Sequence, residues 1–188
     1  TAAEVLANKN ARAAISMIID KQAYCDVILN NGSIPTSTFT PKGLAFDNGK
    51  DYTDLTEGMG YEYNEEQAKE LWEKAKEEVG FDTVEMELLT YDHDLGKRTG
   101  EYIQSELSDL EGLTVKVSNL PFKQKLERET NGEFDLAFSG WGADYPDPLT
   151  YLSTMQTGNQ FSNQVGYNSE EYNKLIEEAM KLPITEGY

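Results

Sequence analysis

The stretch Val84–Trp141 decides the fold, because two kinds of apolar periodicity alternate along it. Three short runs have the apolar, β-branched or aromatic character of strands: VEMELLTY (84–91), LTVKV (113–117) and FDLAFSGW (134–141). Between them, one helical pattern begins at Asp94 or Thr99, and another follows Pro121 to about Thr130. Strands that alternate with helices through short links predict an α/β fold with a parallel sheet and right-handed crossovers.

Helices are also predicted before this stretch. Residues 4–19 carry apolar side chains at helical spacing, and Asp20 can cap a second helix. Asn64 can cap a third helix, which we expect to run to Val79. Between the second and third helices, residues 33–60 are rich in Gly, Pro, Asn and Thr, which predicts a long irregular segment. Long segments of this kind inside compact domains are often functional.

The part of the chain that follows Trp141 predicts two more helices. A short helix is expected from Pro148 to Met155, and residues 157–167 are expected to form a solvated polar loop. Ser169 can cap a last helix. The residues predicted for its buried side are Tyr172, Leu175, Ile176 and Met180. We therefore predict a single α/β lobe over residues 1–188, with irregular loops at its rim.

The charge of the chain excludes several classes of partner. Lysine and arginine number 16 against 34 aspartates and glutamates, so the net charge is −18. Such a surface repels nucleic-acid backbones and anionic membranes, and it favours solubility. A preference for amine-bearing ligands is a weaker interpretation of the same acidity. Cys25 is the single cysteine, so no disulfide within the chain is possible.

Catalytic and metal-binding motifs are weak in this sequence. It has no nucleophile elbow and no phosphate-binding glycine loop, so no catalytic residues and no cofactor are expected. Asp144 and Asp147 could be imagined as the acid and base of a hydrolase, but carboxylates in a Pro-rich loop more often form turns. Residues 92–94 (DHD) and 47–51 (DNGKD) are poor matches to metal sites. We expect a strand end and a turn there, and no metal.

The segment Gly140–Pro148 (GWGADYPDP) is the strongest candidate for a ligand site. It follows the third predicted strand, and in open α/β sheets ligands bind beyond the carboxyl ends of the strands. Gly140 and Gly142 would let another backbone approach closely, and Trp141 between them could form the wall of a pocket. Asp144 then supplies a carboxylate. A tight turn that packs one aromatic side chain is the alternative explanation of the same residues.

Four segments, in this order, resemble the oligopeptide-binding proteins of ABC importers, within family 5 of the extracellular solute-binding proteins. The segments are Asn10–Lys21, Asn64–Lys76, Gly132–Ala137 followed by Gly140–Pro148, and Asn168–Met180. The resemblance covers nearly the whole chain. It implies a lobe like those of type II periplasmic binding proteins, with a mixed or mostly parallel sheet flanked by helices. It also implies that residues 1–188 are most of a carboxyl-terminal lobe whose partner lobe is absent.

The same resemblance implies a function and a site. The chain would belong to the substrate-binding component of a peptide transporter, located outside the cell membrane, as a lipid-anchored protein or in the periplasm. The backbone of Gly140, Trp141 and Gly142 would pair with an oligopeptide, and Asp144 would bind its ammonium group. The implied partners are the peptide and the permease subunits, and no stable oligomer is expected. Another solute in the same fold remains an alternative (a dipeptide, a nickel chelate, haem or an oligosaccharide), as does, less favourably, the hydrolase that would use Asp144 and Asp147.

Overall fold

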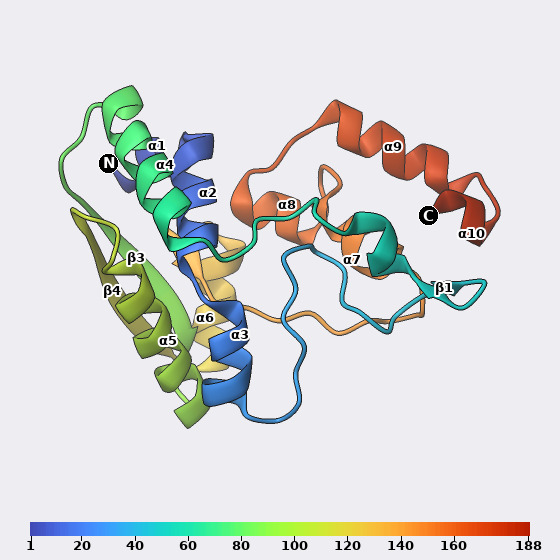
Figure 1. The fold of residues 1–188 in the computed structure, drawn as a ribbon, viewed down its shortest axis with the longest axis horizontal. Helices are drawn as coiled ribbons and strands as arrows, with labels where there is room; N and C mark the ends of the chain where they lie inside the picture. The colour runs from blue at the N-terminus through green and yellow to red at the C-terminus, as the bar shows by residue number, and fades with distance from the viewer. The chain divides into compact units, whose positions relative to one another are not determined.

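The computed structural model describes residues 1–188, which cluster into two compact units (Figure 1). Unit 1 consists of residues 1–35, 61–129 and 133–139. Unit 2 consists of residues 36–60, 130–132 and 140–188.

Unit 1 is built on a three-stranded parallel sheet in the order β4-β3-β5. The central strand β3 (Val84–Tyr91) pairs along its whole length with β4 (Leu113–Leu120). The third strand, β5, contains only Leu136–Ala137, which confirms the parallel α/β prediction but not the predicted length of this strand. Just before β5 in the chain, the carboxylate of Asp135, and not a backbone carbonyl, accepts the amide proton of Glu87 in β3 (2.8 Å). Just after β5, the amide of Phe138 donates a last backbone hydrogen bond to the carbonyl of Leu89 in β3 (2.9 Å).

The helices of unit 1 cover this sheet and pack on one another. In chain order they are α1 (Ala2–Ala7), α2 (Lys9–Ile18), α3 (Lys21–Ala23) with its π-helical continuation η1 (Tyr24–Leu29), α4 (Glu65–Val79), α5 (Asp94–Leu107) and α6 (Phe122–Thr130). The predicted helix over residues 4–19 is two helices, because Asn8 adopts an extended conformation and its side chain accepts from the amide of Ala11. Asp20 and Asn64 cap α3 and α4 as predicted.

The core of unit 1 depends on small residues where helices meet and on one large side chain. Alanines at the contact between α2 and α4 are fully buried, which lets the two helices approach closely. Trp72 of α4 is also fully buried, and its indole N–H donates to the carbonyl of Glu111 (2.9 Å). This bond satisfies the one polar group of the indole, as burial requires.

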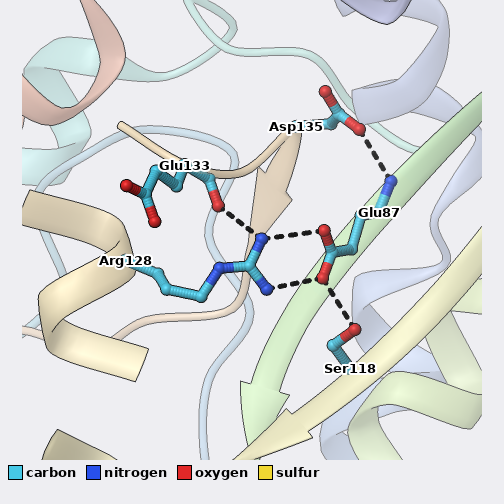
Figure 2. Close-up of polar contacts among 5 residues, drawn as sticks. All are labelled: Glu87, Ser118, Arg128, Glu133 and Asp135. Atoms are coloured by element: carbon cyan, nitrogen blue, oxygen red, sulfur yellow. Dashed lines mark hydrogen bonds and ion pairs between the residues drawn. The ribbon is translucent and has the colours of Figure 1, made fainter. Parts of the chain in front are cut away.

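A polar network connects α6 to the sheet (Figure 2). The guanidinium of Arg128 donates to both carboxylate oxygens of Glu87 (2.7 and 2.9 Å) and to the carbonyl of Glu133 (2.8 Å). Ser118 of β4 donates to the same carboxylate (2.7 Å). Together with Asp135, these contacts join α6, both long strands and the approach to β5. The network thus supplies by side chains what the short strand β5 lacks in backbone pairing.

Unit 2 consists mainly of short elements. Its first part contains a hairpin of β1 (Phe46–Asp47) and β2 (Lys50–Asp51), followed by the 3₁₀ helix η2 (Tyr52–Thr56). The hairpin turn is Asn48-Gly49, and both residues have the positive φ that a two-residue turn of this kind needs. The later elements are α7 (Leu149–Leu152), η3 (Ser153–Met155), α8 (Gln160–Val165), α9 (Glu170–Met180) and α10 (Ile184–Gly187).

Two predictions for this part of the chain are wrong. Residues 157–167 are not a polar loop, because α8 forms there and ends at Gly166, which has a positive φ. The buried side of α9 contains Ile176 but not Leu175 or Met180, which are 57% and 63% exposed. The exposed pair lines an apolar groove of about 560 Å³ together with residues of η2, α7 and α10. Apolar periodicity identifies such a face but does not show whether these 188 residues contain the surface that covers it.

Candidate functional site

The backbone of Gly140–Gly142 is a free edge except at the carbonyl of Trp141, which accepts a hydrogen bond from the hydroxyl of Tyr151 (3.3 Å). These residues belong to no helix or strand of unit 2. The amide and carbonyl groups of both glycines and the amide of Trp141 make no hydrogen bond within the protein. A Cβ atom built on either glycine would meet nothing within 4 Å. Exposed, unpaired backbone groups of this kind can accept water or an added strand.

Thr150 holds the side chain of Trp141 and the backbone of Asp144. It lies in α7 and is only 3% exposed. The indole N–H of Trp141 donates to its carbonyl (2.8 Å), and the amide of Asp144 donates to its hydroxyl (2.9 Å). The sequence prediction missed Thr150, because nothing local marks it as different from the other residues of a short helix.

Asp147 has a structural role in this segment. Its carboxylate accepts the amide proton of Leu149 (2.8 Å), and its carbonyl accepts that of Thr150 (3.1 Å). These bonds form the turn from which α7 begins. Asp147 therefore serves the loop, as carboxylates in Pro-rich turns usually do.

A chain of aromatic contacts extends from the ring of Trp141. Its ring meets Phe161 edge to face, with centroids 5.6 Å apart. Phe161 meets Phe39 in the same way at 6.3 Å, and Phe39 meets Tyr151 at 6.4 Å. Edge-to-face pairs at these separations are favourable contacts. Phe39 and Phe161 come from segments predicted to be irregular or solvated, and the signal that could have identified them is an aromatic residue inside a polar stretch.

Asp144 presents a free negative charge. Its residue is exposed, and its carboxylate makes no hydrogen bond or ion pair within the protein. Its backbone is fixed by Thr150. An exposed carboxylate on a fixed backbone can accept hydrogen bonds from a cationic group of a ligand.

His93 and Asp51, which belong to the two weak matches to metal sites in the sequence, have structural roles. His93 caps α5 by accepting the amide proton of Gly96 (3.0 Å), and its ring stacks on Tyr91 with centroids 5.1 Å apart. Asp51 accepts the amide protons of Gly43 (2.6 Å) and Thr53 (2.8 Å) and caps η2. No group of three or more His, Cys, Asp or Glu residues is placed to hold a metal ion. None of the helices is both long and apolar enough to cross a bilayer.

Known proteins match this chain over almost all of its length. It is 32% identical to the dipeptide-binding protein of Lactococcus lactis subsp. cremoris (strain MG1363), an alignment that covers 97% of this chain and 33% of that protein. It superposes with a TM-score of 0.90, at 36% identity, on the substrate-binding domain of an oligopeptide ABC transporter from Bacillus anthracis, covering 97% of this chain and 36% of that one. It superposes with a TM-score of 0.87, at 39% identity, on Listeria monocytogenes OppA bound to peptide, covering 92% of this chain and 34% of that one.

The chain thus spans about a third of the length of the curated relatives it matches. The solved structures have the same lobe with a parallel sheet flanked by helices, which confirms the predicted fold class. The sequence model of the bacterial extracellular solute-binding proteins, family 5, matches residues 1–163. The chain belongs to this family.

Proposed function

We propose that these residues are part of the substrate-binding component of a peptide ABC transporter. The observation that carries the proposal is the free backbone edge at Gly140–Gly142, followed by the free carboxylate of Asp144. The relatives support it, since they include proteins named for binding dipeptides and oligopeptides and a structure with bound peptide. A sugar has neither an ammonium group to pair with this carboxylate nor a main chain to add as a strand.

A peptide would bind this site through groups that all peptides share. Its main chain would pair with the backbone of Gly140, Trp141 and Gly142, as an added strand pairs with a sheet edge. Its ammonium group would form a charge-assisted bond with Asp144, which is stronger than a bond between neutral groups. One side chain would pack against Trp141, whose ring is held by Thr150 and Phe161. Binding of this kind depends little on the sequence of the peptide.

The same proposal places the whole protein outside the cell membrane, where it would deliver peptides to a permease. The family consists of extracellular solute-binding proteins, which supports this location. A lipid anchor on the outer face of the membrane, or free diffusion in a periplasm, would keep the protein near its transporter. The net charge of −18 would keep it soluble and favour ligands that carry an amine.

Calorimetric titration of the full-length protein with tri- to hexapeptides tests the proposal. We expect Asp144→Asn to weaken binding of peptides with a free amine by about 10- to 100-fold, the value of one charge-assisted hydrogen bond. N-acetylated peptides should lose affinity for the parent protein and be almost indifferent to Asp144→Asn. Asp109→Asn, which changes an exposed carboxylate in unit 1, is the matched control and should change neither titration.

Two results would contradict this function. If no peptide releases or absorbs heat while a sugar or a metal chelate does, the peptide proposal is wrong. If acetylation weakens binding equally in the parent and in Asp144→Asn, the ammonium group is bound elsewhere.

A further inference from the structure

An ion pair is buried at the end of unit 1 that leads into the proposed site. Lys125 and Glu129 lie one turn apart on α6, and they are only 1% and 6% exposed. Glu129 accepts hydrogen bonds from Lys125 and from the hydroxyl of Ser139. Lys125 also donates to the hydroxyl of Ser139 (3.0 Å), and its ammonium group lies 4.3 Å from the centre of the Tyr91 ring. Every charged group of this cluster therefore has a partner.

Stability alone does not account for such a pair. Removing two charges from water costs several kcal/mol, by order of magnitude, and well-packed apolar residues of similar size often serve stability equally well. What apolar residues cannot do is hold a hydroxyl group. The contacts of the pair with Ser139 are thus the part of the cluster that needs charge and hydrogen bonding.

Ser139 is the last point at which unit 1 holds the chain before the free edge. The strand β5 ends at Ala137, and the last backbone hydrogen bond is the one from Phe138 to Leu89. The next three residues, Gly140–Gly142, make no hydrogen bond through an amide, and Gly140 begins unit 2. Gly140 makes no hydrogen bond of its own and its torsions are permissive, so the side-chain contacts of Ser139 add the restraint that lies nearest to it on the amino-terminal side.

We propose that Lys125 and Glu129 are positioning residues for peptide capture, which act by fixing Ser139 and with it the first residue of the Gly140–Gly142 edge. This inference rests on the proposed function, since it assumes that this edge pairs with a peptide. An edge that is ordered before binding loses less conformational entropy when the ligand arrives, and this raises affinity. The cluster gains its effect through Ser139 and does not touch the ligand.

The test uses substitutions in the full-length protein that remove the polar groups of the cluster and keep its side-chain volume. The double variant Lys125→Met/Glu129→Leu keeps the volume and removes both charges. Ser139→Ala removes only the hydroxyl of an exposed residue, so it remains informative if the double variant does not fold. Ser139→Thr restores a hydroxyl. The matched control is Arg128→Met/Glu87→Leu, which removes another ion pair between α6 and the sheet that does not contact Ser139.

We expect the double variant and Ser139→Ala to bind a tripeptide about tenfold more weakly in calorimetry. A tenfold loss of affinity is similar to the contribution of roughly one charge-assisted hydrogen bond. Their thermal midpoints should stay near that of the parent, and Ser139→Thr should recover affinity. The control should lower the thermal midpoint and leave affinity unchanged. Parent-like affinity in Ser139→Ala, or an equal loss of affinity in the control, would overturn the proposal.

A second readout does not depend on peptide binding. In backbone nitrogen-15 NMR relaxation, the amides of Gly140–Gly142 should have lower order parameters in Ser139→Ala than in the parent, with no change across β3 and β4. Unchanged order parameters at these residues refute the positioning role. If the parent binds no peptide at all, the proposed function fails, while the relaxation experiment still decides whether the cluster orders this edge.

Discussion

Glu87→Gln isolates the energetic value of the network in Figure 2. Glu87 accepts two hydrogen bonds from Arg128 and one from Ser118, and the side chains of Glu87 and Arg128 are each 32% exposed. Exposed pairs contribute about 0 to 1 kcal/mol, whereas breaking a buried pair costs about 3 to 5 kcal/mol. With intermediate burial, we expect Gln to reduce the free energy of unfolding by about 2 kcal/mol at pH 7. At a urea dependence of roughly 2 kcal/mol per molar, the midpoint falls by about 1 M.

The pH dependence makes this prediction specific. The hydrogen bonds from Arg128 hold the pKa of Glu87 below its ordinary value of 4.5, partial burial opposes them, and Ser118 adds to the lowering. A carboxylate whose pKa is lower in the folded state stabilises the fold fully above the unfolded pKa, and this stabilisation is lost as pH falls through the folded pKa. The gap between parent and Glu87→Gln should therefore close in acid.

Urea unfolding of the 188-residue chain, followed by tryptophan fluorescence at pH 7 and at several values below pH 4.5, measures the gap. Glu85→Gln is the matched control on the same strand, because Glu85 and its partner Lys116 are 58% and 67% exposed. It should change stability by less than about 0.5 kcal/mol. A gap that persists unchanged in acid, or a control as damaging as Glu87→Gln, would refute the reasoning.

Three further substitutions test the core and the site. Gly100→Ala would place a Cβ 2.6 Å from Val117 and should destabilise unit 1 by about 1 to 3 kcal/mol in urea unfolding. Trp72→Phe should cost about 2 to 4 kcal/mol, since it opens a cavity and leaves a backbone carbonyl without its donor; thermal unfolding that matches the parent would contradict this. Thr150→Val removes the acceptor of the Asp144 amide, so calorimetry should show peptide binding about fivefold weaker for a loss of about 1 kcal/mol.

The fold was predictable from the sequence where the signal is local. The caps at Asp20, Asn64 and Ser169 lie where they were predicted, because each is a contact over three residues. The length of β5 was not predictable, because a carboxylate from Asp135 replaces a backbone partner in the ladder. The covered side of α9 was not predictable either, because burial depends on what lies opposite and periodicity reports only the helix itself.

The candidate site shows the same division. The segment Gly140–Asp144 was identified from its glycines, its tryptophan and its place after a strand, and its ligand-binding role remains a prediction. The residues that fix it, Thr150 and Phe161, come from later in the chain and were missed. Their contacts with Trp141 join residues 9 and 20 positions apart, and no pattern of spacing along the chain encodes such contacts.

The double anchoring by Thr150 couples Trp141 and Asp144 mechanically. The carbonyl of Thr150 accepts the indole proton of Trp141, and its hydroxyl accepts the backbone amide proton of Asp144. Any displacement of α7 must therefore carry the ring of Trp141 and the backbone of Asp144 together, so that the interval between these two groups is constant while their common position changes. Under the proposed function, this interval would correspond to the separation of the peptide's terminal amine from its first packed side chain. Changes of selectivity are then expected through the size of the side chain at position 141, and not through the distance between the two groups.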